Sequence, residues 1–322
     1  MTLLSRRSFV VSAATASAAF GLKGRLAFIN PVQAQSTDLP RFARFAIGDI
    51  EVTQLYDGVW HKAHDPNFIA GVSVEETKKA LRDANLTDAH VPITFTITVL
   101  RMGDKLVMFD SGTGGQMAPT AGLLMKESMQ AAGIDPKSIS TIIMTHFHPD
   151  HIFGLMEKGT NAQVFPDAEL VVPASEYKYW TDEGVIATLP EARQGLAQRI
   201  QATFPKWKNV RQVENDAEVV PGVRSVASNG HTPGHTSYLV SSGSDQLMVL
   251  GDVTNLPALF VRNPGWHASF DQDPEMAEST RRKMFDRVIA DKITITGYHY
   301  GMPGAGTIEK DGSGYAYKPI SA

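Results

Sequence analysis

Four residues that can bind a metal ion lie within six positions of the chain: His146, His148, Asp150 and His151. The chain has only 10 histidines in total, so this density is not expected from composition. Neutral imidazoles and carboxylates are the ligands that suit Zn²⁺ and similar divalent ions. In an extended segment His146 and His148 point the same way, and Pro149 then turns the chain so that Asp150 and His151 approach from another side. The pattern predicts a metal site with enough ligands for two ions.

Three further candidate ligands each follow an apolar stretch with the character of a β-strand. The candidates are His235, Asp252 and His299, and the stretches before them are residues 223–227, 247–250 and 293–296. Residues at the ends of neighbouring strands gather at one edge of a sheet, so ligands far apart in sequence can meet there. We therefore expect all seven residues to form one site.

Strands and helices alternate along the chain, and their pattern defines the fold class. Two strand-rich blocks, roughly residues 42–172 and 210–300, are joined by a helical stretch. Helices are predicted at residues 74–84, 117–132, 174–180 and 274–290; the first has a capping box and the last begins with Asp273 followed by a proline. Two sheets packed face to face bury this many apolar strand faces. The prediction is an α/β fold, an αββα sandwich of two mixed β-sheets flanked by helices.

The motifs around these ligands are similar to those of the metallo-β-lactamase-fold hydrolase superfamily, and within it to methyl parathion hydrolase and related lactonases and esterases. The resemblance rests on residues 109–112, 145–151, 230–236, 250–252 and 312–315. It implies two divalent metal ions, with Zn²⁺ as the first choice and Mn²⁺, Co²⁺ or Fe²⁺ as alternatives. By the family pattern His146, His148 and His235 would hold one ion. Asp150, His151 and His299 would hold the other, with Asp252 bridging the two.

Two more residues are assigned supporting roles on the same basis. Asp110 ends a strand before Gly112 and is expected to hydrogen-bond a ligand imidazole without touching the metal. His231 shares a loop with His235, and the family pattern is taken to use the second of the two. We therefore expect His231 to make an ordinary hydrogen bond within the loop.

The resemblance also implies an activity: hydrolysis of small esters, lactones or phosphotriesters by a hydroxide that bridges the two metals. Asp150 is expected to be catalytic, because it can align that hydroxide or pass its proton to the leaving group. A β-lactamase or a thioesterase would use the same ligands, and a non-catalytic metal-binding protein on this fold is a further alternative. The residues expected to shape an apolar pocket for a small-molecule substrate are Met117, Trp180, Phe260, Trp266 and Tyr298.

Composition and the N-terminus limit the partners and the location. The chain has no cysteine, so a metal must be held by histidines and carboxylates, and the net charge of −4 does not favour nucleic acid. Arg6 and Arg7 form a twin-arginine pattern before a short apolar stretch. We expect residues 1–34 to be a twin-arginine signal peptide, residues 35–322 to be a single domain in the periplasm, and no stable membrane anchor. A homodimer is one candidate assembly, which the sequence does not decide.

Overall fold

The computed structural model of the protein describes residues 39–321, and the predicted signal peptide lies outside these residues. The predicted αββα sandwich is confirmed, with two sheets of seven strands each. The first sheet contains, in spatial and chain order, β1 (Phe42–Ile47), β2 (Ile50–Lys62), β3 (Val91–Met102), β4 (Lys105–Phe109), β5 (Ile139–Ile143), β6 (Glu169–Pro173) and β7 (Val210–Val213). Strands β1 to β4 pair antiparallel and β4 to β7 pair parallel, so the sheet is mixed.

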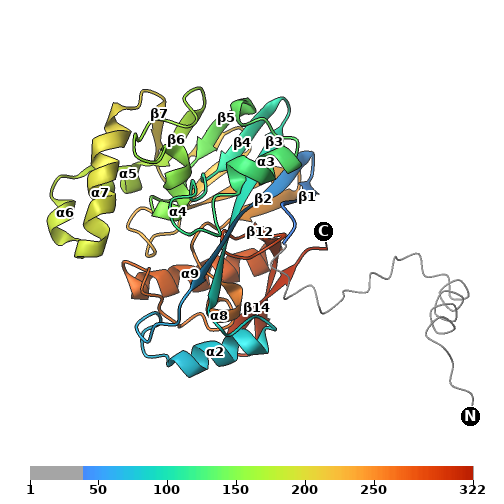
Figure 1. The fold of residues 1–322 in the computed structure, drawn as a ribbon. Helices are drawn as coiled ribbons and strands as arrows, with labels where there is room; N and C mark the ends of the chain where they lie inside the picture. The colour runs from blue at the N-terminus through green and yellow to red at the C-terminus, as the bar shows by residue number, and fades with distance from the viewer. Residues whose placement is uncertain (1–38, 322) are drawn as a thin grey trace, which may run out of the picture. The chain divides into compact units, whose positions relative to one another are not determined.

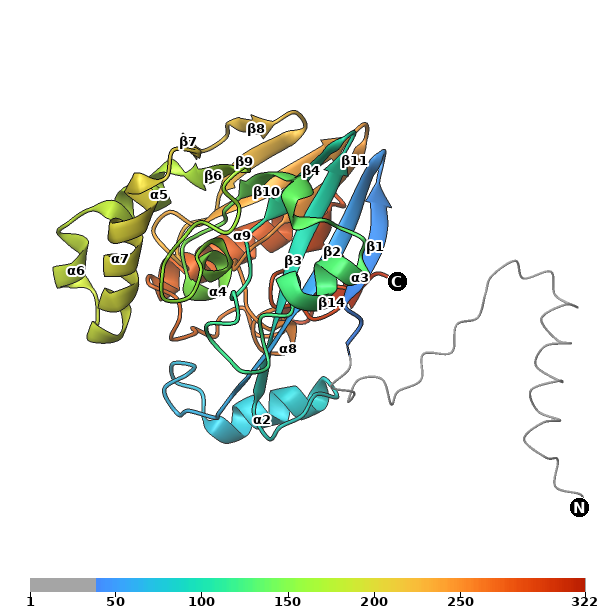
Figure 2. The ribbon, with the colours of Figure 1, turned by 45° about the horizontal axis from the view of Figure 1, so that its top comes forward.

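The second sheet runs in the reverse spatial order and is also mixed. Its strands are β14 (Gly314–Pro319), β13 (Ala305–Asp311), β12 (Thr294–Thr296), β11 (Asp245–Val249), β10 (Thr236–Ser242), β9 (Val223–Ala227) and β8 (Glu218–Val220). Only β11 and β12 pair parallel. The second strand-rich block begins at residue 210 as predicted, but its first strand, β7, pairs with β6 and completes the first sheet. Figure 2 shows β4 and β11, one from each sheet, running in nearly the same direction.

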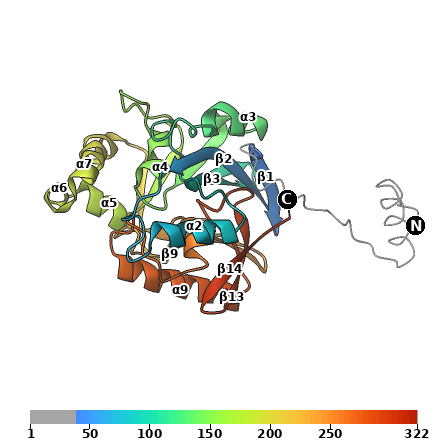
Figure 3. The same ribbon diagram turned by 60° about the horizontal axis from the view of Figure 1, so that its bottom comes forward.

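Helices cover the outer faces of both sheets. The α-helices are α2 (Val74–Asp83), α3 (Met129–Ala131), α4 (Pro149–Ile152), α5 (Ala174–Thr181), α6 (Val185–Thr188), α7 (Glu191–Thr203), α8 (Pro257–Phe260) and α9 (Pro274–Ala290). In Figure 3, α9 lies on one side of the strands and α3 on the opposite side. Figure 1 shows α5, α6 and α7 together beside β6 and β7. Short π- and 3₁₀-turns occur at Leu124–Ser128, Pro136–Ser138, Phe153–Leu155 and Phe204–Lys206.

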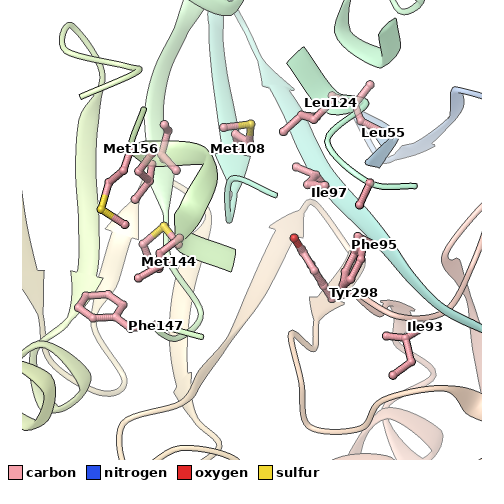
Figure 4. Packing of buried hydrophobic residues seen from close by; sticks show 14 of the residues in the cluster. Leu55, Ile93, Phe95, Ile97, Met108, Leu124, Met144, Phe147, Met156 and Tyr298 are labelled. Carbon is pink, nitrogen blue, oxygen red and sulfur yellow. The ribbon is translucent and has the colours of Figure 1, made fainter. Parts of the chain in front are cut away.

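The core consists of three apolar layers, as this arrangement requires. Between the sheets, Val52 and Phe109 of the first sheet pack with Tyr238 and Val249 of the second. A second layer lies between the second sheet and α9, and the largest lies between the first sheet and its helices. Figure 4 shows part of that largest layer, where Leu55, Ile97 and Met108 lie near Leu124.

Helix α2 confirms the predicted capping box: the Ser73 hydroxyl accepts a hydrogen bond from the Glu76 backbone, and the Glu76 side chain accepts one from the Ser73 backbone. The helix predicted at residues 117–132 is wrong in its first part, since helical structure begins only at Leu124. Ala121 forms a bridge to the first sheet, and Gly122 has a φ of 93°, which a helix does not allow. Within the described part of the chain, no helix has the length and apolar character needed to cross a membrane.

Candidate metal centre

The ligand segments all lie at one edge of the sandwich, where strands from both sheets end. His146 and His148 follow β5 in the first sheet, and Asp150 and His151 lie in the short helix α4. Phe147, between the two histidines, points back into the core near Met144, as the alternation of an extended segment predicts (Figure 4). The second sheet supplies the loop between β9 and β10, which contains His231. It also supplies Asp252, three residues after β11, and His299, three residues after β12. The site therefore depends on the packing of both sheets.

Three histidines form the first ligand group: His146, His148 and His231. Each offers one ring nitrogen, and these atoms lie within 4.8 Å of one another. His148 Nδ1 is 2.8 Å from His231 Nε2, and the His146 ring centroid lies 4.8 Å from each of the other two. Three imidazole nitrogens that converge in this way match the ligands of a zinc site.

The third member of this group differs from the sequence-based assignment, which chose His235 and stays a prediction. His235 lies beside this group, with its ring centroid 5.0 Å from that of His146, and both of its ring nitrogens have partners: the Asp252 backbone N–H donates to Nε2 at 2.9 Å, and Nδ1 lies 2.8 Å from the Ser228 hydroxyl. His235 is fully buried, and burial lowers its pKa to about 3, which keeps the ring neutral. In this structure His235 Nε2 accepts a hydrogen bond from the Asp252 backbone, while His231 Nε2 lies 2.8 Å from His148 Nδ1 and 3.4 Å from Asp252 Oδ2.

The second ligand group consists of Asp150, His151, Asp252 and His299, whose donor atoms also lie within 4.8 Å of one another. His299 Nε2 lies 2.9 Å from Asp252 Oδ2 and 3.5 Å from Asp150 Oδ2. His151 Nε2 lies 3.3 Å from Asp252 Oδ1 and 3.5 Å from Asp150 Oδ2. This group mixes two imidazoles with two carboxylates.

Asp252 lies between the two groups. Its Oδ1 contacts His151 and its Oδ2 contacts His299, both in the second group. The same Oδ2 lies 3.4 Å from His231 Nε2 in the first group. A carboxylate has two oxygens and can therefore contact two cations at once. The geometry agrees with the expected bridging position of Asp252.

The imidazoles are fixed by hydrogen bonds on the side away from the centre. Asp110 Oδ2 lies 2.9 Å from His151 Nδ1, and the same carboxylate accepts hydrogen bonds from the backbone and hydroxyl of Thr145. Asp271 Oδ1 lies 2.8 Å from His231 Nδ1, and the Thr94 carbonyl lies 2.7 Å from His299 Nδ1. An acceptor at Nδ1 places the proton there and leaves the Nε2 lone pair directed at the centre. Asp110 thus makes the imidazole contact expected of it.

The two groups differ in their electrostatics. Burial lowers the pKa of His146 and of His148 well below the ordinary value, and the neighbouring histidines lower it further. Burial alone would also lower the pKa of His151, but the carboxylates of Asp150, Asp252 and Asp110 outweigh it and raise the pKa well above the ordinary value. The pKa of His299 is raised in the same way, chiefly by Asp252.

Buried atoms at the centre fit a bound cation. Among the described residues, His146 Nε2, His151 Nε2 and Asp252 Oδ1 are buried without a hydrogen-bond partner. Leaving such a group unsatisfied costs about 1–3 kcal/mol. Nitrogen lone pairs and carboxylate oxygens are the donors that a divalent metal requires, and these three atoms come from the two ligand groups. The seven residues of the two groups therefore fit two divalent metal ions.

The predicted substrate pocket is only partly supported. Trp180 and Phe260 are 0% exposed and belong to the core, so they form no open surface. Tyr298 is also buried; its ring stacks on His151 at 3.8 Å and its hydroxyl donates to the Asp150 carbonyl at 2.6 Å. These three assignments are corrected to packing roles. Met117 is exposed and Trp266 is half-buried, so both remain accessible to a substrate.

A cavity of about 390 Å³ lies elsewhere, and none of the metal-centre residues lines it. Its walls include Asp57, Ser111, Phe153 and Met156. The cavity is therefore not the metal centre.

Sequence reasoning missed two residues that support the centre. Asp271 lies 40 positions after its partner His231 and is itself contacted by Arg281, with 3.3 Å between Arg281 Nη2 and Asp271 Oδ2. Glu176 in α5 contacts the backbone of both ligand loops. Neither residue belongs to a local pattern, since each contact is formed by the tertiary fold.

The fold and the two ligand groups define the class of the protein: the chain belongs to the metallo-beta-lactamase superfamily, whose family model matches residues 96–291. Among curated proteins it is similar to an N-acyl homoserine lactonase of a Bacillus species, with 27% identity over 167 residues, which is 52% of this chain and 58% of that relative. It is also similar to the N-acyl homoserine lactonase AttM of Azorhizobium caulinodans, with 28% identity over 120 residues, 35% of this chain and 40% of that protein. The chain thus matches about half the length of these relatives.

Solved structures extend the likeness over most of the chain. AidC, a dizinc quorum-quenching lactonase in complex with a product, N-hexanoyl-L-homoserine, aligns with a TM-score of 0.82 and 26% identity, covering 88% of this chain and 99% of that one. The hydrolase AbOPH aligns with a TM-score of 0.81 and 24% identity over 88% of this chain and 99% of that one, and supports the fold alone.

Proposed function

We propose that this protein is a dizinc lactonase that opens the ring of small N-acyl homoserine lactones. The observation that carries the proposal is the pair of complementary ligand groups, with Asp252 between them, on a chain similar over most of its length to a dizinc lactonase. The curated relatives that the chain matches over half their length are also lactonases of this substrate class.

The two groups of residues would hold the ions on either side of Asp252. Two divalent ions held there would polarise the lactone carbonyl and lower the pKa of water toward neutrality. Asp110, Asp271 and the Thr94 carbonyl each lie against one Nδ1 atom, so they direct the Nε2 atoms of His151, His231 and His299 toward the centre.

Asp150 is suited to move a proton in this reaction. Its Oδ2 lies 3.5 Å from both His151 and His299, and its side chain is the most exposed of the second group, at 13%. Burial alone would raise the pKa of Asp150, but the two neighbouring imidazoles outweigh it and keep the carboxyl ionised. Ring opening adds water across the ester bond, so the proton that leaves the attacking water can pass through the Asp150 carboxylate to the alkoxide that departs.

A substrate panel tests this function. The metal-loaded chain would be assayed on N-hexanoyl-homoserine lactone, an aryl ester, a thioester, a phosphotriester and a β-lactam, with Asp252→Ala as the inactive control. We expect kcat/KM to be highest on the lactone and negligible for the control on every substrate. A higher kcat/KM on another substrate would assign that chemistry to the site, and two bound metals without turnover of any substrate would support a non-catalytic role.

We also propose that the protein is exported to the periplasm by the twin-arginine route. The support is the sequence alone, with Arg6 and Arg7 before an apolar stretch and a cleavage site after Ala34. Replacing both arginines by lysine should retain the precursor in the cytoplasm, as measured by cell fractionation. Unchanged export of that variant would contradict the proposal.

A further inference from the structure

One buried acid outside the two ligand groups contacts the backbone on both sides of the first group. Glu176 lies in α5 and is 0% exposed. Its Oε1 accepts hydrogen bonds from the Phe147 backbone at 2.9 Å and the Trp180 indole at 2.7 Å. Its Oε2 accepts from the Thr232 hydroxyl at 2.8 Å and the Gly234 backbone at 2.9 Å.

These partners lie next to metal-ligand residues in sequence. Phe147 separates His146 from His148 in the loop after β5 of the first sheet, and Thr232 directly follows His231 in the loop between β9 and β10 of the second. A single carboxylate therefore connects the two loops that supply all three imidazoles of the first group. No residue of the second ligand group contacts Glu176 through these hydrogen bonds.

The loop between β9 and β10 also packs closely against α5. A side chain added at Gly234 would place its Cβ 2.1 Å from the Glu176 backbone nitrogen, so the loop lies directly against α5 and only glycine fits. The separation of the two loops is thus set by α5 and by the length of the Glu176 side chain.

We propose that Glu176 is a positioning residue that fixes the distance between the two loops and preassembles His146, His148 and His231 for the first metal ion. The inference rests on the two-metal site of the proposed function, but not on the substrate. Partners that orient metal ligands without touching the metal change its affinity by about 10- to 100-fold when they are removed. Glu176 acts on the loop backbones, whereas Asp110 and Asp271 act on single imidazoles.

The four hydrogen bonds require a carboxylate. An ionised carboxylate offers about four lone-pair sites on two oxygens and no donor. A glutamine amide has one oxygen, so its NH₂ group would face either the Phe147 and Trp180 donors or the Thr232 and Gly234 donors. Glu176→Gln therefore keeps the shape of the side chain but must release one of the two loops.

Asp57 provides a matched control. It is also 0% exposed, and its carboxylate accepts hydrogen bonds from the Thr113 backbone and hydroxyl at 2.8 and 2.7 Å and from the Leu124 backbone at 2.8 Å. Burial raises the pKa of both acids from their ordinary values. Asp57 contacts neither loop of the first ligand group, so Asp57→Asn reproduces the loss of a buried acceptor without that connection.

The experiment measures zinc affinity without using catalysis. Wild type, Glu176→Gln and Asp57→Asn, each as the full metal-free protein, would be titrated with Zn²⁺ against a chromophoric chelator, and thermal unfolding of the metal-free forms would be recorded. His231→Ala, which removes a first-group ligand, identifies the step of the titration that belongs to the first ion.

We expect Glu176→Gln to weaken that first-group step by about 10- to 100-fold and to change the other step less than about twofold. Asp57→Asn should leave both zinc-binding steps unchanged, even if its unfolding midpoint falls as far as that of Glu176→Gln. If Glu176→Gln is too unstable to purify, Thr232→Val removes a single donor and should weaken the same step by about threefold. Wild-type zinc affinities at both steps in Glu176→Gln and in Thr232→Val, or equal weakening of both steps in Glu176→Gln, would overturn the inference. A wild type that binds two zinc ions but opens no lactone would contradict the proposed substrate and leave this test unaffected.

Discussion

The first and second ligand groups face each other across Asp252 but are held in place by different means. The first group, His146, His148 and His231, contains no carboxylate, and burial lowers the pKa of His146 and His148 well below the ordinary value. The second group contains two carboxylates, which attract cations and raise the pKa of His151 and His299. The two carboxylates therefore favour a cation electrostatically at the second group, whereas the first group depends on rigid placement of its imidazoles.

Asp252→Ala removes the residue that the two groups share, so it should have the largest effect. Loss of the bridging oxygens should weaken binding of both ions. The transition-state stabilisation lost with them, several kcal/mol, corresponds to about a 10³-fold fall in kcat/KM. Lactone hydrolysis and zinc content by mass spectrometry check the result. Near-normal activity with two zinc ions per chain would show that the groups are independent.

Asp150→Asn affects the second group alone. The amide cannot take up a proton as the carboxylate does, and loss of general acid–base catalysis corresponds to about a 10²-fold fall in kcat. The variant would be assayed at saturating zinc, with zinc content measured in the same samples. Full activity with both ions bound would exclude the proton-transfer role of Asp150.

His231→Ala and His235→Ala form a pair that tests which of the two histidines is the third ligand of the first group. Loss of a direct ligand should weaken first-group zinc binding by at least the roughly 10- to 100-fold that removal of a supporting partner produces. His235→Ala should mainly lower thermal stability, because His235 accepts a hydrogen bond from the Asp252 backbone inside the core. Zinc titration of both variants decides whether His231 or His235 is the ligand. Weaker zinc binding in His235→Ala than in His231→Ala would support the assignment made from the sequence.

The pH dependence of zinc binding should differ between the two groups. We expect this effect to be smaller than those of the substitutions. The raised pKa values of His151 and His299 mean that these rings carry protons in the metal-free protein, so zinc must displace them and its affinity rises with pH through those values. His146 and His148 have lowered pKa values and are already neutral above about pH 6.5, so their proton loss adds nothing there.

Calorimetry in buffers of different ionisation enthalpy counts the protons released. We expect about one or two protons per zinc in His231→Ala, which retains the second group, and fewer in His299→Ala, which retains the first. Equal proton release from the two variants would contradict the difference in charge between the groups.

The sequence predicts the second group more fully than the first, for a physical reason. His146, His148, Asp150 and His151 are local neighbours after one strand, and Asp252 and His299 each follow a strand at the same edge. His231 and His235 lie four residues apart in one loop, so only the path of that loop decides which ring faces the metal. Glu176 and Asp271 leave no local pattern, because their partners come from distant segments.

The pocket was predicted less well because exposure of an aromatic residue depends on its neighbours in the fold. Trp180 fits any apolar role in sequence, but its indole donates to Glu176 inside the core. The αββα sandwich itself was predictable, since alternating strands and amphipathic helices leave few other ways to bury their apolar faces. The misplaced helix start at Met117 reflects the bridge between Gly58 and Ala121, which no local signal indicates.

Stepwise reconstitution tests the central claim most directly. The metal-free protein would be titrated with Zn²⁺ while hydrolysis of N-hexanoyl-homoserine lactone is followed. We predict no turnover before zinc is added, and activity that rises until two zinc ions are bound per chain and then stays constant. Full lactone hydrolysis by the metal-free protein, or two bound zinc ions with no lactone hydrolysis, would contradict the account.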